Sequence, residues 1–152
     1  MFKKAILCSL AILMIGIITF LVLTNYIPSK APLAIIKYNN LSIPTVESMN
    51  NWFDEKTGGN SRLSLPPEEN TKELLPILVE PNSNITIGFD TKFRPKMVEI
   101  LQWKNGKIVS TAIIKSNIFT VPSVPGIYVY EIIGKWNDTH NSAHSFRIEV
   151  KN

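Results

Sequence analysis

The sequence predicts an all-β fold, an immunoglobulin-like antiparallel β-sandwich, preceded by a single N-terminal transmembrane helix. Three observations predict it. Residues 5–23 form an uncharged apolar run. The C-terminal half contains six or seven short segments in which apolar and polar residues alternate, which is the pattern of half-buried strands. Turn signals separate these segments about every 8–12 residues, a spacing typical of all-β sandwiches.

The apolar run is long enough for a membrane anchor. Its 19 residues would span about 28 Å as a helix, close to the ~30 Å hydrocarbon core of a bilayer. Lys3 and Lys4 precede the run, and the next charge is Lys30. Because cytoplasmic flanks carry an excess of Lys and Arg, we expect residues 1–4 in the cytoplasm and residues 5–25 in the membrane. The expected localisation is the cell membrane, single-pass, with the C-terminal domain outside.

Two other interpretations of the N-terminus stay open. A cleaved signal peptide has an apolar run of about 7–15 residues that ends in a small-x-small site. This run is longer, and the weak site at 29–31 is followed by Pro32. In a lipoprotein the modified cysteine closes the apolar run, whereas Cys8 opens it. Cys8 is also the only cysteine, so the domain beyond the run has no disulfide and no thiolate metal site.

The charge balance gives no indication of nucleic-acid binding. The chain has 16 basic and 12 acidic residues, and without Lys3 and Lys4 the remainder has 14 basic and 12 acidic. Nucleic-acid binding needs a clustered basic surface, so we expect no nucleic-acid partner. The length that remains after the anchor suffices for one domain.

Residues 26–73 are expected to be an irregular juxtamembrane segment. Prolines at 28 and 32 end the preceding helix, and a candidate strand follows at 34–38. The stretch at 39–70 has no clear pattern. One or two helical turns are expected at 67–75, beginning with Pro67. The domain at 74–152 buries little surface alone, because it is small. We therefore expect the segment to pack on it, with Trp52 and Phe53 supplying apolar contact.

Six strands are predicted within the domain, at 85–90, 97–103, 108–114, 117–121, 127–135 and 143–151. Asn105-Gly106 lies between the second and third of them. Asn-Gly is the strongest short hairpin signal, because a type I′ turn needs positive φ at both central residues. Residues 136–142 are predicted to be a polar loop.

The alternation also assigns side chains to the two faces of the sheets. Even-numbered residues of the last two strands are mostly apolar and are predicted to face the core, and His144 lies in that register. Tyr128, shortly after Pro125-Gly126, fits a tyrosine corner, in which the hydroxyl bonds back to the turn. Trp103 and Trp136 are predicted to be buried, whereas Trp52 is predicted to be the most exposed of the three tryptophans.

Short motifs along the chain resemble a group of uncharacterised Bacillus-type exported or membrane-anchored envelope proteins with an immunoglobulin-like C-terminal domain. The resembling segments are 40–44, 73–75, 85–87, 89–90, 102–103, 119–122, 125–130, 135–136 and 146–150. The resemblance implies this fold and an envelope location, and it implies no activity. Many members carry a cysteine pair, one of them in a Gly-Ser-Tyr-Cys-Trp segment. Only Trp52 of that segment is present here, so the disulfide is absent.

No residue pattern indicates catalysis. The chain lacks G-x-S-x-G, H-E-x-x-H and P-loop motifs, so we expect no enzyme activity and no cofactor. Asp138, His140 and His144 are weak candidates for a metal site, because two histidines four apart converge on a helix. They lie at a loop–strand junction, where that geometry fails, and a hydrogen-bonded His144 at the rim of the core is the simpler interpretation.

The predicted function is an outward-facing immunoglobulin-like module that binds another cell-envelope protein. Loops carry function on such scaffolds. The candidate interaction residues are Trp52, Phe53, Ser123, Val124, Asn137, Asp138, Thr139 and His140. Two alternatives stay open: an envelope protein that binds a small ligand or metal, and an extracellular domain resembling protease inhibitors, which share the Pro-Gly-x-Tyr strand.

Overall fold

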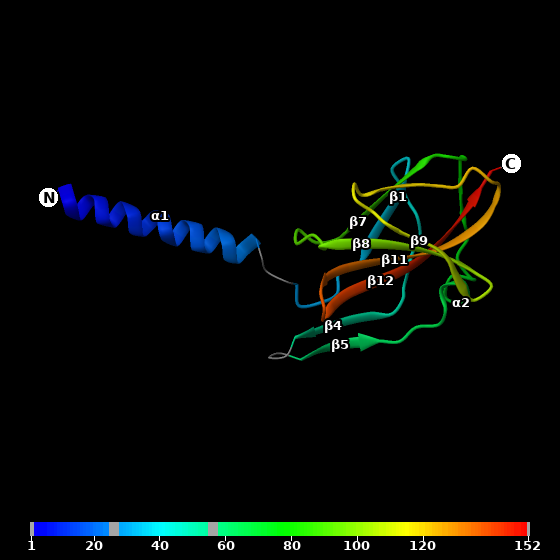
Figure 1. Ribbon diagram of the computed structural model, residues 1–152, viewed down its shortest axis with the longest axis horizontal. Coiled ribbons are helices and arrows are strands. Elements are labelled where there is room, and N and C mark those ends of the chain that lie inside the picture. Colours follow the sequence, from blue (N-terminus) through cyan, green and yellow to red (C-terminus); the bar gives the residue numbers. More distant parts are fainter. Residues whose placement is uncertain (1, 25–27, 55–57, 152) are drawn as a thin grey trace.

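The computed structural model describes residues 2–24, 28–54 and 58–151. In these residues one long helix precedes two β-sheets that face each other (Figure 1). Almost all strand pairs are antiparallel, and the exception is the parallel pair of β6 with β12. The predicted all-β, antiparallel architecture is confirmed.

Helix α1 (Phe2–Thr24) is drawn apart from the sheets in Figure 1. Residues 9–20 of α1 are all exposed. Within the described part of the chain, no helix is long and apolar enough to cross a membrane. The transmembrane helix at 5–25 therefore stays a prediction. The side chain of Cys8, on which the lipoprotein alternative depends, and the segment 25–27 lie outside the described residues.

The smaller sheet has four strands in the order β10-β7-β1-β2. Their bounds are β10 (Ile118–Thr120), β7 (Asn84–Phe89), β1 (Ala34–Tyr38) and β2 (Leu41–Ser42). In β1, residues 34, 36 and 38 are buried and the two between them are exposed. This alternation is the period-two pattern of a strand with one face on a core.

The larger sheet has eight strands, and its main path is β5-β4-β12-β11-β8-β9. The bounds are β5 (Gly58–Arg62), β4 (Asn50–Asp54), β12 (His140–Val150), β11 (Gly126–Asn137), β8 (Met97–Lys104) and β9 (Lys107–Ile113). Two further strands, β3 (Val46–Glu47) and β6 (Ile77–Val79), also pair with β12. One helical turn, α2 (Pro67–Asn70), contacts β8, β11 and β12.

The hydrophobic core lies between the two sheets. The smaller sheet contributes Ile36 and Ile87, and the larger sheet contributes Ile132 and Phe146, all at most 1% exposed. Residues 26–73, expected to be irregular, supply β1 to β5 and α2. The core therefore spans both parts of the chain that the sequence divides at residue 74.

Two local turn predictions are confirmed. Asn105 (φ 55°) and Gly106 (φ 72°) connect β8 to β9, as a type I′ hairpin requires. The carboxylate of Glu68 in α2 accepts hydrogen bonds from both of their backbone N–H groups, at 2.9 and 2.5 Å. The Tyr128 hydroxyl donates to the Val124 carbonyl at 2.8 Å, which completes the tyrosine corner.

The predicted polar loop at 136–142 is wrong. Strand β11 continues to Asn137 and β12 begins at His140, so only Asp138 and Thr139 form the turn. The physical reason is that Trp136 and His140, at 1% and 6% exposure, are buried against neighbouring aromatic rings. Burial of these two side chains favours continued strand pairing over a solvated loop.

Candidate functional site

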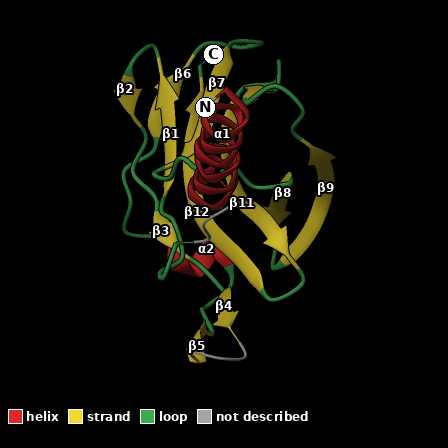
Figure 2. Ribbon diagram, turned by 90° about the vertical axis from the view of Figure 1, so that its left-hand side faces the viewer, coloured by secondary structure: helices red, strands yellow, loops and turns green. Residues whose placement is uncertain are grey.

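Strand β9 forms a free edge of the larger sheet in the part of the chain that the structure describes. All seven of its residues are exposed. Ile108, Val109 and Ile113 are 48%, 53% and 57% exposed. Figure 2 shows β9 at the side of the molecule, with β8 as its neighbour. A strand of this kind presents unpaired backbone groups together with apolar side chains.

The outward backbone groups of β9 follow from its pairing with β8. The Ile114 N–H donates to the Val98 carbonyl at 2.8 Å. Backbone hydrogen-bonding groups alternate between the two sides of an antiparallel strand, so the N–H groups of Thr111 and Ile113 point away from β8. Both are therefore available to another strand.

Natural edge strands are commonly protected by charge or proline. In β9 only Lys107, its first residue, is charged and none is proline, and the register with β8 shifts once, between Gln102 and Trp103. The opposite end of the same sheet is different, because β5 has the polar sequence Gly-Gly-Asn-Ser-Arg, and its Arg62 pairs with Glu47 at 2.9 Å. Of these two edges, β9 is the one suited to accept an apolar extended segment.

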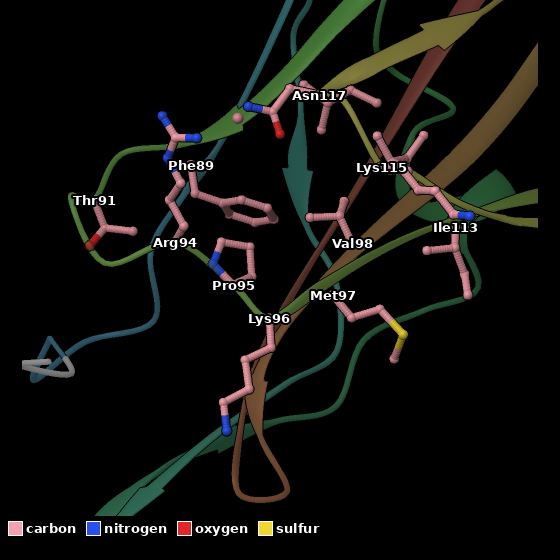
Figure 3. Close-up of a pocket in the computed structure, with 13 residues that line it drawn as sticks. Phe89, Thr91, Arg94, Pro95, Lys96, Met97, Val98, Ile113, Lys115 and Asn117 are labelled. Carbon is pink, nitrogen blue, oxygen red and sulfur yellow. The ribbon is translucent and has the colours of Figure 1, made fainter.

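A cavity of about 650 Å³ lies beside the end of β9 (Figure 3). Its apolar lining includes Phe89 from the end of β7, Pro95 from the β7–β8 loop, Val98 from β8 and Ile113 from β9. Figure 3 shows the rings of Phe89 and Pro95 and the side chain of Val98 gathered at its centre. The edge strand and the cavity therefore form one continuous surface, since they share Ile113.

The Phe89 ring occupies the space above a glycine. A Cβ atom on Gly134 would lie 2.5 Å from Phe89 Cζ and 2.9 Å from Cε2. Such separations are shorter than carbon–carbon contact allows. Gly134 therefore lets the Phe89 ring pack directly against β11.

Replacing Gly134 with Ala is expected to destabilise the protein by about 1–3 kcal/mol, because the added methyl group overpacks the site against Phe89. Urea unfolding of the full chain in a non-ionic detergent measures this loss. The matched control is Gly88→Ala, since a Cβ there meets its nearest atom at 4.0 Å, and a change within about 0.5 kcal/mol is expected. Equal losses in both variants would contradict the packing role of Gly134.

The prediction that Trp52 is the most exposed tryptophan is wrong. Trp52 is 4% exposed, and its Nε1–H donates to the Pro28 carbonyl at 2.7 Å. Its ring meets Trp136 and His140 edge-on, with centroids 5.0 and 4.8 Å away. Trp136 is buried as predicted, whereas Trp103 is only partly buried. Phe53, beside Trp52, is 44% exposed and remains open to a partner.

The other candidate interaction residues fall into two groups. Asn137, Thr139 and His140 lie together, because His140 Nδ1 is 2.9 Å from Asn137 Oδ1 and 3.0 Å from Thr139 Oγ1. Asp138 is exposed in the same turn. Residues 123–124 lie beyond the other end of β11, and a strand of 12 residues is about 40 Å long. The predicted loops therefore do not form one surface.

The histidines of the predicted metal set are separated by strand geometry. His140 and His144 both lie on β12, and four residues of strand span about 13 Å. No group of three His, Cys, Asp or Glu that could hold a metal ion occurs in the described residues. His144 instead contacts its surroundings through both ring nitrogens, at 3.4 Å from the Ala34 N–H group and 3.4 Å from the Ser142 hydroxyl.

Burial of His144 predicts a pH-dependent stability. Burial lowers its pKa from the ordinary 6.5, and the nearby carboxylates of Glu47 and Asp90 oppose this only in part. Below about pH 6.5 the unfolded chain therefore binds a proton that the folded state does not. The stability contribution is present above that pH and is lost as the pH falls, by at most about 1.4 kcal/mol per pH unit.

Urea unfolding at pH values above and below 6.5 would measure how the free energy of unfolding changes, with His144→Gln as the comparison. The difference in slope between the two proteins isolates the contribution of His144 from that of other groups. The expected result is a shallower loss of stability in the variant as the pH falls. Identical slopes would show that His144 is protonated equally in the folded and unfolded states.

Comparison of the chain with protein-family models, with curated proteins and with solved structures gives no match. Sequence reasoning missed both β9 as an edge and the cavity beside it. The sequence contained one signal of the cavity, because Lys92, Arg94 and Lys96 alternate along the loop that borders it.

Proposed function

We propose that this chain is a membrane-tethered immunoglobulin-like module that binds an extended segment of another cell-envelope protein by adding it as a strand to β9. The observation that carries the proposal is the edge strand itself: seven exposed residues, with outward N–H groups at Thr111 and Ile113. Strand addition uses backbone hydrogen bonds for affinity and alternate side chains for specificity.

The free energies of the single contacts indicate that binding at β9 needs several of them together. Each new backbone hydrogen bond contributes about 0.5–1.5 kcal/mol net, so two outward N–H groups alone give weak binding. Burial of Ile108, Val109 and Ile113, each about half exposed, adds about 25 cal/mol for each Å² of apolar surface removed from water. A partner segment is therefore expected to be apolar where it meets these three residues.

The tether is supported by the composition and exposure of α1. The run at 5–23 carries no charge, and its large side chains from Leu10 to Phe20 are 51–71% exposed. An exposed apolar surface of this kind is costly in water. Insertion of α1 in a membrane would remove the cost, and Lys3 and Lys4 favour a cytoplasmic N-terminus.

The immunoglobulin-like assignment is supported by the two facing sheets and by the tyrosine corner at Tyr128. The resemblance to Bacillus-type envelope proteins belongs to the same proposal. Both are consistent with a domain that displays loops and edges outside the cell. Neither supplies a catalytic group, and the proposed role is binding.

Photo-crosslinking in intact cells tests the proposal. A photoreactive amino acid replaces Val109 in β9, and the control position is Leu78, whose exposure of 49% is close to that of Val109. The expected result is one adduct, enriched at position 109 over position 78, whose partner is an envelope protein. Equal labelling at both positions, or none at 109, would overturn the proposal. Extraction of the membranes at alkaline pH tests the tether separately, because an inserted helix stays in the pellet.

A further inference from the structure

The cavity beside β9 combines an apolar centre with a cationic rim. Its volume of about 650 Å³ is within the range of small-molecule sites, about 300–1,000 Å³. Phe89, Pro95, Met97 and Val98 supply apolar surface, and Arg94, Lys96 and Lys115 supply positive charge. The residues that line it include no acidic side chain. The cavity is therefore suited to a ligand that is both anionic and apolar.

The three cations have no partner of opposite charge in the described residues. Within the described part of the chain, the side chains of Arg94, Lys96 and Lys115 form no hydrogen bond and no ion pair. The nearest acidic residues along the chain are already engaged: Asp90 accepts from the Leu33 N–H group at 2.7 Å, and Glu99 pairs with Lys135 at 2.8 Å. The positive potential at the rim is therefore uncompensated.

The arrangement of the cations limits the kind of anion. Figure 3 shows the ends of Arg94, Lys96 and Lys115 directed to different sides of the apolar centre. They do not converge on one point, so a free phosphate ion would contact only one of them. A ligand with its charge at the rim and an apolar part over Phe89 and Pro95 would use the whole site.

The cavity lies near the point where the chain from α1 enters the domain. Leu33 and Asp90 form two hydrogen bonds, the second from the Asp90 N–H group to the Leu33 carbonyl at 3.0 Å, and Thr91 lines the cavity. The Trp136 indole donates to the Phe93 carbonyl at 2.6 Å and holds the same loop. If α1 is inserted, this end of the domain faces the lipid surface.

We propose that this cavity binds an anionic phospholipid, with its phosphate headgroup at the cationic rim and the upper part of an acyl chain on the apolar centre. Arg94 supplies the bidentate donor geometry that suits phosphate. Lys96 and Lys115 do not contact the same phosphate and add positive potential at the rim. The location rests on the tether proposed above, whereas the charge and shape of the cavity do not. The role goes beyond partner binding, because it orients the domain and β9 relative to the membrane.

Calorimetric titration of the full chain in an uncharged detergent tests the proposal. The probes are short-chain phosphatidylglycerol, the zwitterionic phosphatidylcholine of the same chain length, and inorganic phosphate. Phosphatidylglycerol is expected to bind at least tenfold more tightly than either of the others. Arg94→Gln, which removes the donor to the phosphate, is expected to weaken its binding about fivefold or more, and Lys115→Gln, which removes only a charge at longer range, about threefold.

The matched control is Lys92→Gln. Lys92 is exposed on the same loop and does not line the cavity, so this variant removes the same charge and should change the affinity by less than about twofold. Equal affinity for the two lipids would overturn the proposal, as would phosphate binding as tight as the lipid or an equal loss in the Lys92 variant. Because the titration needs neither partner nor membrane, its failure is distinguishable from failure of the crosslinking at β9.

Discussion

Replacing Trp136 with Ala is expected to lower the free energy of unfolding by about 3–5 kcal/mol, the range for removing a fully buried large aromatic side chain. Trp136 is 1% exposed. Its ring meets Trp52 and Phe89 edge-on, at centroid distances of 5.0 and 5.2 Å. The substitution would also remove the 2.6 Å hydrogen bond from the indole to the Phe93 carbonyl, and the loss of one hydrogen bond costs about 0.5–1.5 kcal/mol.

Urea unfolding of the full chain in non-ionic detergent, followed by circular dichroism, measures this loss. Trp136→Phe separates the two causes, because it keeps most of the ring volume and removes the N–H donor. We expect the free energy of unfolding of Trp136→Phe to lie between those of the wild type and Trp136→Ala. A loss below about 1 kcal/mol in Trp136→Ala, the size typical of an average substitution, would show that this aromatic cluster does not stabilise the fold.

Replacing Thr111 with Pro is expected to reduce capture of the partner at least tenfold. Proline has no N–H group, and at an edge strand it is tolerated where that group faces solvent. The N–H of Thr111 points away from β8, so the substitution removes a donor for the added strand and leaves the pairing of β8 with β9 intact. The proline ring also obstructs the approach of another backbone.

The yield of the crosslink from position 109 measures the effect in cells. Thr111→Ala is the matched control, because it removes the same side chain and keeps the N–H group, and its yield should stay within about twofold of the original. The melting temperature of the Pro variant should match that of the Ala variant. If the Ala variant loses the adduct as well, the side chain and not the backbone edge carries the binding.

The features that depend on neighbouring residues could be predicted from the sequence. Asn105-Gly106 specifies a hairpin through its own φ preferences, so β8 and β9 end within one residue of the expected bounds. The period of two predicted the core-facing, even-numbered residues of β11 and β12. It did not predict that residues 129, 131, 143 and 145 on the opposite face are buried as well. The tyrosine corner at Tyr128 involves a bond over four residues, which is also local.

The features that depend on distant pairing could not be predicted. β4 is held by residues of β12 about 90 positions away, and its residues have no alternating pattern of their own. The burial of Trp52 follows from contacts with Pro28, Trp136 and His140. The edge position of β9 is a property of strand order, and the cationic rim joins Arg94 and Lys115 only through the fold.

Amide hydrogen exchange at Thr111 and Ile113 tests the central proposal most directly. The full chain would be measured alone and in complex with the partner identified by crosslinking, with the amides of β5, the polar edge of the same sheet, as the internal reference. Strand addition predicts strong protection of both β9 amides in the complex and no change in β5. Protection elsewhere on the domain, with Thr111 and Ile113 still exchanging as in the free protein, would contradict it.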